Sequence, residues 1–178
     1  YLTFTMAGEL YGVDIRLVRE VLDMTEIVHI PQAETHMLGV VNLRGNAIPV
    51  VDLRRRFGLG STEVSVHTRI MILELPLDDG VVLAGAQADS VKEVLELDEA
   101  AIAPPPDMGL AVDRACVIGL TRHRERFLLL LDMIKALLGE EATSGARSGE
   151  RLGPSASGPA PAPLTSGAHP DPAATTRE

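Results

Sequence analysis

Short runs of alternating apolar and polar residues fill most of the first 140 positions of the chain. The clearest example is residues 40–54, where two β-rich apolar runs flank a brief polar interruption. Gly45 and Asn46 reach positive φ at low cost, so we expect the chain to reverse there. Arg44 would then lie beside the turn, where two stiff strands limit its freedom. The pattern predicts a β-hairpin.

Similar patterns predict further hairpins over residues 2–15, 66–86 and 114–131. Residues 14–22 instead predict a helical turn, because Ile15, Val18 and Leu22 lie at near-helical spacing with Val21 alongside. Short helices are also expected over residues 53–58 and 132–138, whereas residues 88–97 fit helix and strand equally well. Regular hairpins with few helical turns predict an all-β barrel or sandwich.

Composition changes this picture in two ways. The chain has no Trp, three Phe and two Tyr, so its core must be built from branched aliphatic side chains. Its formal charge of −9 leaves no basic face for phosphates, and few aromatic rings are present to stack on bases, so nucleic acid is not an expected partner. A barrel that binds oligonucleotides is therefore disfavoured.

Three observations concern the compartment and the chain ends. The single cysteine, Cys116, lies in an apolar run and is expected to be a buried thiol. Neither a transmembrane run nor a secretory leader is visible, so we expect a cytoplasmic protein without membrane insertion. Because the chain opens at Tyr1 within a strand-like pattern, we expect further residues upstream.

The composition shifts abruptly after Gly139, where Pro, Gly, Ala, Ser and Thr become dominant. Such a segment buries too little apolar surface to offset the entropy of ordering it. The sequence therefore predicts one folded domain over residues 1–140 and a disordered tail over residues 141–178.

The sequence shows little catalytic chemistry. Its five histidines are scattered and form no metal-ligand spacing, and Gly58–Gly60 lacks the lysine and hydroxyl of a phosphate loop. The three arginines of residues 54–56 are expected to form a solvated face. We therefore predict no catalytic residue, metal or cofactor and favour a binding module. A small β-barrel enzyme stays open as an alternative, because members of a Ser-His-Asp site can be far apart in sequence.

Several segments in order resemble the CheW family of chemotaxis proteins. They are Tyr-Gly-Val-Asp-Ile at 11–15, Val-Arg-Glu-Val at 18–21, Gly-Val-Val-Asn-Leu-Arg-Gly at 39–45 and Ile-Pro-Val-Val-Asp-Leu-Arg at 48–54, followed by Asp-Ser-Val-Lys-Glu-Val-Leu at 89–95, Ile-Gly-Leu at 118–120 and the run 128–132. The resemblance covers about residues 1–140. It implies two interwoven five-stranded SH3-like barrels that share an aliphatic core, with a few short helices.

The resemblance also implies a function. Proteins of this family are non-enzymatic adaptors that join the regulatory domain of the histidine kinase CheA to the cytoplasmic tips of chemoreceptors. The same domain occurs at the end of CheA and in the first half of CheV, so a fragment of either is an alternative. We prefer a stand-alone adaptor, held at the inner face of the membrane through receptor arrays.

By resemblance, the residues that contact partners are Val18, Glu20, Val21, Asn42, Arg44 and Gly45. Other interpretations stay open for each. Val18 and Val21 fit a core equally well, and Glu20 fits a solvated charge. Arg44 is also placed to cap a turn carbonyl or to pair with Asp14 or Asp52, as read from sequence order alone.

Overall fold

Residues 1–107 and 109–139 are described by the structure, a computed structural model. They form ten strands: β1 (Leu2–Met6), β2 (Glu9–Val13), β3 (Val18–Asp23), β4 (Met37–Leu43), β5 (Asn46–Asp52), β6 (Arg69–Leu77), β7 (Gly80–Ala88), β8 (Ser90–Val94), β9 (Val117–His123) and β10 (Arg126–Leu131). Two short α-helices are α1 (Leu53–Arg56) and α2 (Met133–Leu138), and 3₁₀ turns are η1 (Ile15–Leu17), η2 (Glu99–Ala101) and η3 (Arg114–Cys116). The predicted tail at 141–178 lies outside the described residues.

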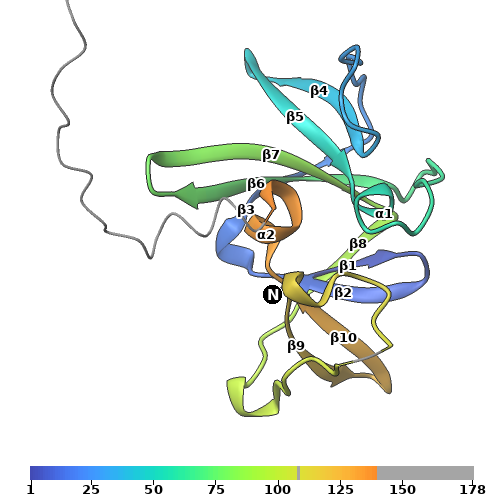
Figure 1. Ribbon diagram of the computed structural model, residues 1–178, viewed down its shortest axis with the longest axis vertical. Helices are drawn as coiled ribbons and strands as arrows, with labels where there is room; N and C mark the ends of the chain where they lie inside the picture. Colours follow the sequence, from blue (N-terminus) through green and yellow to red (C-terminus); the bar gives the residue numbers. More distant parts are fainter. Residues whose placement is uncertain (108, 140–178) are drawn as a thin grey trace, which may run out of the picture. The chain divides into compact units, whose positions relative to one another are not determined.

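The strands form two curled five-stranded sheets (Figure 1). The second sheet is built from the consecutive strands β3 to β7, which are inserted between β2 and β8 of the first sheet. The first sheet has the order β8-β1-β2-β10-β9 and the second has the order β3-β6-β7-β5-β4. β3 follows β2 in sequence but pairs with β6, and β8 follows β7 but pairs with β1. The predicted all-β fold of two interwoven barrels is confirmed.

The two sheets repeat one arrangement strand by strand. In each, an antiparallel hairpin joins a second hairpin through a parallel pair, β5 with β7 or β10 with β2. An aspartate then ends each second hairpin and caps a helix, because Asp52 accepts from the Arg54 N–H and Asp132 accepts from the Ile134 N–H. The hairpin β4–β5 with α1 is therefore the counterpart of β9–β10 with α2.

An aliphatic core is shared between the sheets, as the composition predicts. Phe4 and Tyr11 from the first sheet, Leu73 from the second, and Leu53 and Met133 from the two helices are at most 1% exposed and belong to one cluster. Each fully buried side chain of this kind contributes about 1.5–3 kcal/mol. Two smaller clusters lie on other strand faces, one centred on Val41, Ile48, Val50, Ile70 and Ile72 and one on Leu10, Leu128 and Leu130.

One expectation about local structure is wrong, and one ambiguous segment is settled. Residues 14–22 contain only the short turn η1, and residues 18–23 are the strand β3 rather than a helix. Ile15, Val18 and Leu22 fit a helical period, but Val18 and Leu22 also fit the alternating spacing of a strand, and pairing with β6 selects the strand. The ambiguous segment 88–97 contains the strand β8.

Candidate functional site

The turn between β4 and β5 is tighter than the sequence suggested. Arg44 and Gly45 are the residues with positive φ, at 51° and 86°, whereas Asn46 already belongs to β5. Two consecutive positive φ values match the twist of the flanking strands, as in type I′ turns. The Asn42 side chain fixes this turn, because its Oδ1 accepts a hydrogen bond from the Gly45 N–H at 2.9 Å. Arg44 therefore lies within the turn, not beside it.

The two valines of β3 differ in burial. Val18 is half-buried and packs against the shared core, whereas Val21 is 38% exposed. A β-bulge between Val18 and Glu20 interrupts the alternation of the strand, and Val18 pairs with Leu73 while Val21 pairs with Met71. Because Leu73 and Met71 are two residues apart in β6, the two valines share one face of the sheet. Val21 is the exposed apolar side chain of the pair.

The curl of the second sheet brings β3 to the β4–β5 turn, although the two outer strands β3 and β4 stand at opposite ends of the strand order. One guanidinium nitrogen of Arg44 lies 3.3 Å from a carboxylate oxygen of Glu20. Arg44 is 69% exposed and Glu20 23% exposed, so the ion pair contributes about 0–1 kcal/mol. It orients two charges more than it stabilises the fold.

The other pairings that the sequence left open for Arg44 do not form. Asp14 instead accepts from Arg16, and this side-chain hydrogen bond holds the pKa of the Asp14 carboxyl below its ordinary value. Asp52 is 1% exposed and accepts from the backbone of α1 and from Thr62. Among the carboxylates of Asp14, Asp52 and Glu20, Arg44 therefore pairs only with Glu20 of β3.

We call the surface formed by these residues the β3–turn surface. It comprises Val18, Glu20, Val21, Asn42, Arg44 and Gly45, of which Val18 is its most deeply packed member. Gly45 has open space where a Cβ would project, so its positive φ, rather than a close neighbour, explains the glycine. All six residues come from two stretches of chain that the curled sheet brings together.

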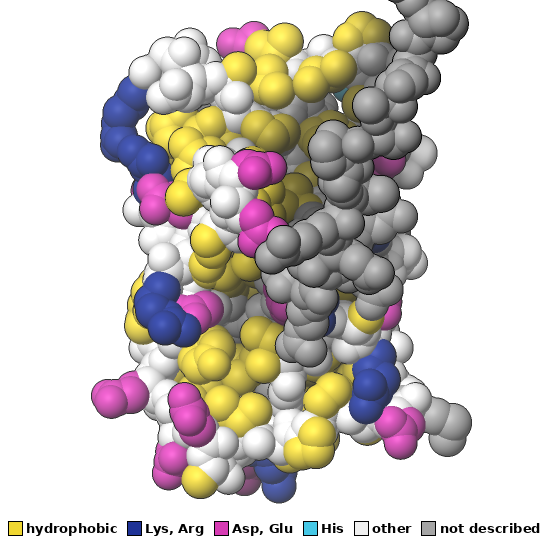
Figure 2. Space-filling view, turned by 60° about the vertical axis from the view of Figure 1, so that its left-hand side comes forward, with side chains coloured by type: hydrophobic (Ala, Val, Ile, Leu, Met, Phe, Trp, Pro, Cys, Tyr) yellow, Lys and Arg dark blue, Asp and Glu magenta, His cyan; other side chains and the backbone are white. Residues whose placement is uncertain are grey.

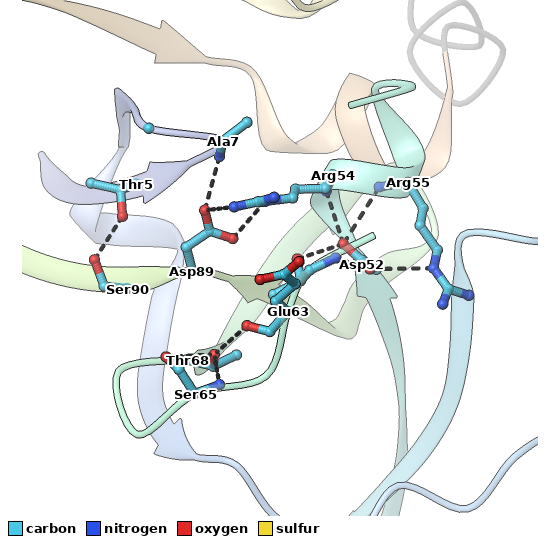
Figure 3. Close-up of polar contacts among 12 residues, drawn as sticks. Thr5, Ala7, Asp52, Arg54, Arg55, Glu63, Ser65, Thr68, Asp89 and Ser90 are labelled. Carbon is cyan, nitrogen blue, oxygen red and sulfur yellow. Dashed lines mark hydrogen bonds and ion pairs between the residues drawn. The ribbon is translucent and has the colours of Figure 1, made fainter. Parts of the chain in front are cut away.

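The arginines of α1 form the contacts that the sequence failed to predict. Arg54 donates from Nε at 2.8 Å and from Nη2 at 2.5 Å to the two carboxylate oxygens of Asp89, and the Ala7 N–H donates to the same carboxylate at 2.9 Å (Figure 3). Asp89 lies between β7 and β8, so this contact links α1 to the β1–β2 turn of the other sheet. Neighbouring Asp89 raises the pKa of Arg54.

The other two arginines are also engaged. Arg55 lies 3.4 Å from Asp52 and donates to the Thr35 carbonyl, and Arg56 donates to the Ala136 carbonyl of α2 at 2.7 Å. The expectation of a solvated arginine face is therefore wrong. The sequence carries no signal for these partners, because Asp89 and Ala136 are 35 and 80 residues away.

An open groove of about 410 Å³ lies on the first sheet, lined mainly by apolar side chains such as Leu110, Leu120, Phe127 and Leu129. Tyr11 also lines it, and burial followed by the nearby Glu9 carboxylate raises the pKa of Tyr11. Among the described residues, no cluster of three His, Cys, Asp or Glu side chains is placed to hold a metal ion.

Charges of both signs are interspersed on the face shown in Figure 2, between several patches of hydrophobic side chains. This mixture is typical of surfaces that bind other proteins, where apolar centres are rimmed by charges. Within the part of the chain that the structure describes, no helix has the length and apolarity needed to span a bilayer.

The family model for the CheW-like domain matches residues 1–141. The chain belongs to the CheW-like domain family. The chemotaxis protein CheW of Klebsiella aerogenes is 32% identical over 141 residues, which cover 79% of this chain and 82% of that protein. The CheW protein of Bacillus subtilis is 28% identical over 145 residues, covering 82% and 90%.

A solved structure is similar too. The scaffolding protein TtCheW from Thermoanaerobacter tengcongensis superposes with a TM-score of 0.69 and 35% identity, covering 78% of this chain and 88% of that one. The resemblance and the fold expected from the sequence are therefore confirmed. Together the CheW-like relatives and this scaffolding protein support a chemotaxis coupling adaptor.

Proposed function

We propose that this chain is a non-enzymatic adaptor that couples the histidine kinase CheA, through its regulatory domain, to the cytoplasmic tips of chemoreceptors. The observation that supports this most strongly is the β3–turn surface, where the turn arginine Arg44 is held by the strand glutamate Glu20. The adaptor would work in the cytoplasm, held at the membrane through receptor arrays.

The geometry supports a mechanism based on orientation alone. Arg44 is 69% exposed, so most of its donors are free to meet a partner, while Glu20 fixes the direction of the guanidinium. A partner that offers its own carboxylate must compete with Glu20, and the low free energy of an exposed ion pair makes this exchange reversible. Val21, which follows Glu20 in β3 and is 38% exposed, would supply apolar contact area. Binding of this kind needs no covalent step.

The test compares Arg44→Glu with Arg114→Glu, a matched reversal at an arginine on η3 that is 54% exposed and also in an ion pair. We expect Arg44→Glu to abolish receptor-dependent autophosphorylation of CheA in reconstituted assemblies. Its melting temperature should stay within about 3–4 °C of the wild type, because the lost ion pair contributes less than about 1 kcal/mol. Equal loss of coupling in Arg114→Glu, or full coupling in Arg44→Glu, would refute the proposal.

Apolar members of the surface need a second pair of variants. Val21→Lys adds a charge at an exposed position and should weaken receptor coupling without unfolding the protein. Val18→Lys would place an ammonium against the shared core and should lower the melting temperature as well. A selective loss of coupling in Val21→Lys therefore separates partner contact from folding.

We also propose that residues 1–140 suffice for coupling. Truncation after Glu141 should leave binding to the CheA regulatory domain and to a receptor-tip fragment unchanged in a pull-down. Loss of either interaction would assign a role to residues 142–178.

A further inference from the structure

The first sheet contains a copy of the glutamate–arginine pair that marks the β3–turn surface. Val-Arg-Glu-Val at 18–21 in β3 corresponds to Val-Lys-Glu-Val at 91–94 in β8, and each strand occupies the same outer place in its sheet. The β9–β10 turn corresponds to the β4–β5 turn, with Arg124 and Glu125 at positive φ of 46° and 67°. Arg124 lies 3.3 Å from a carboxylate oxygen of Glu93.

The copy differs from the original in charge. His123 and Arg126 flank its turn, whereas Leu43 and Asn46 flank the turn of the second sheet. A cavity of about 170 Å³ opens between β8 and this turn. Its lining includes the cations Lys92, Arg124 and Arg126, the carboxylate of Glu93 and the hydroxyl-bearing Thr3 and Thr5. Three permanent cations thus face one carboxylate in a chain whose net charge is −9.

The cations that line this cavity keep hydrogen-bond donors that no described residue accepts from. Both contacts from Arg124 to Glu93 are long, at 3.3 and 3.4 Å, and Arg124 is 75% exposed. Lys92 is exposed and forms no ion pair with any described residue. Arg126 donates one hydrogen bond to the Gly8 carbonyl, which leaves other guanidinium donors.

A buried nitrogen of His123 also lacks a hydrogen-bond acceptor in the described part of the chain. Nε2 of His123 has no hydrogen-bond partner among the described residues and lies 3.4 Å from the carboxylate of Glu93, without the alignment of a hydrogen bond. A buried polar atom left unpaired is costly. An additional acceptor in the cavity would engage the arginine and lysine donors and allow Glu93 to turn toward the imidazole.

We propose that this cavity binds an acidic side chain from a segment of a partner protein. An aspartate or glutamate carboxylate matches the donor fork of Arg124, and the small cavity suits one carboxylate rather than an extended ligand. Because β8 and the β9–β10 turn belong to the other sheet, this site is separate from the β3–turn surface. The proposal therefore goes beyond receptor and kinase coupling at that surface and stands independently of it.

The test measures binding of a fluorescein-labelled hexaglutamate peptide to the full chain by fluorescence anisotropy at low salt. We expect Arg124→Gln to weaken binding about fivefold to tenfold, because one charge-assisted contact is lost. Arg44→Gln, the matched change in the other turn, should alter the dissociation constant less than about twofold. Raising the salt concentration should weaken binding of the wild type.

Lys92→Gln provides a second variant that leaves the Arg124 turn intact, and melting curves check the folding of all variants. A loss of binding in folded Lys92→Gln supports the site even if Arg124→Gln fails to fold. Absence of hexaglutamate binding, or equal weakening by Arg44→Gln and Arg124→Gln, would overturn the proposal. Competition by inorganic phosphate as effective as that by unlabelled hexaglutamate would assign the cavity to a small anion instead of an acidic segment.

Discussion

Removing the carboxylate of Asp89 should destabilise the protein more than breaking the Arg44–Glu20 ion pair of the β3–turn surface. In Asp89→Ala the Arg54 guanidinium loses two hydrogen bonds and the Ala7 N–H loses one. The two side chains are 24% and 19% exposed, so water replaces these bonds only in part. Charge-assisted hydrogen bonds and half-buried charges of this kind suggest a loss of about 2–3 kcal/mol in the free energy of unfolding.

Urea denaturation measures this loss directly, and calorimetry should show a melting temperature lower by roughly 6–12 °C for a domain of this size. Asp78→Ala in the exposed β6–β7 turn is the matched control and should change stability by less than about 0.5 kcal/mol. A double-mutant cycle with Arg54→Ala should give a coupling energy of about 1.5–3 kcal/mol. A coupling energy near zero would refute the argument that this pair joins the two sheets.

Three further predictions concern single positions. Gly39→Ala should cost more than about 3 kcal/mol in urea denaturation, because φ is +142° and a Cβ would lie 2.1 Å from the Val28 carbonyl oxygen. Cys116 should react with a thiol reagent more slowly than a free cysteine, because it is only 4% exposed and this burial, followed by Asp113, raises its pKa. Asp14→Asn should lower the free energy of unfolding at neutral pH, because the ionised Asp14 carboxylate, whose pKa is lowered, stabilises the fold. When the free energy of unfolding is measured at decreasing pH, the difference from the wild type should vanish as Asp14 becomes protonated.

The hairpins were predictable because their signals are local. Alternation and turn residues lie within about fifteen positions of one another, and the structure confirms the β4–β5 and β9–β10 hairpins. The exact turn was harder to predict, because Asn46 adopts positive φ more readily than Arg44, yet the strand register places Arg44 in the turn and Asn46 in β5. β3 was mistaken for a helix because its apolar residues satisfy both periods until its partner β6 is known.

The residues of the candidate site come from the family resemblance, whereas their contacts were not predictable. Arg44 and Glu20 as partner contacts stay a prediction, and their ion pair depends on how far the sheet curls. Arg54 was read as solvated because its neighbours in sequence are arginines and its acceptor, Asp89, is remote. Periodicity describes which face a residue occupies, but a charged side chain finds its partner through tertiary structure.

The chain crosses between the two sheets twice, from β2 to β3 and from β7 to β8, next to both glutamate–arginine pairs. Each pair joins an outer strand to a turn of the same sheet, and the strand that precedes it in sequence belongs to the other sheet. A partner that displaced either pair would therefore act on a strand whose covalent neighbour lies in the other sheet. Arg54 and Asp89 resist relative motion of the sheets at the same junction. A change at the β3–turn surface would consequently reach the first sheet through the connecting strands and the Arg54–Asp89 ion pair. Weakening the Arg54–Asp89 pair should therefore reduce coupling between the two sheets before it reduces partner binding.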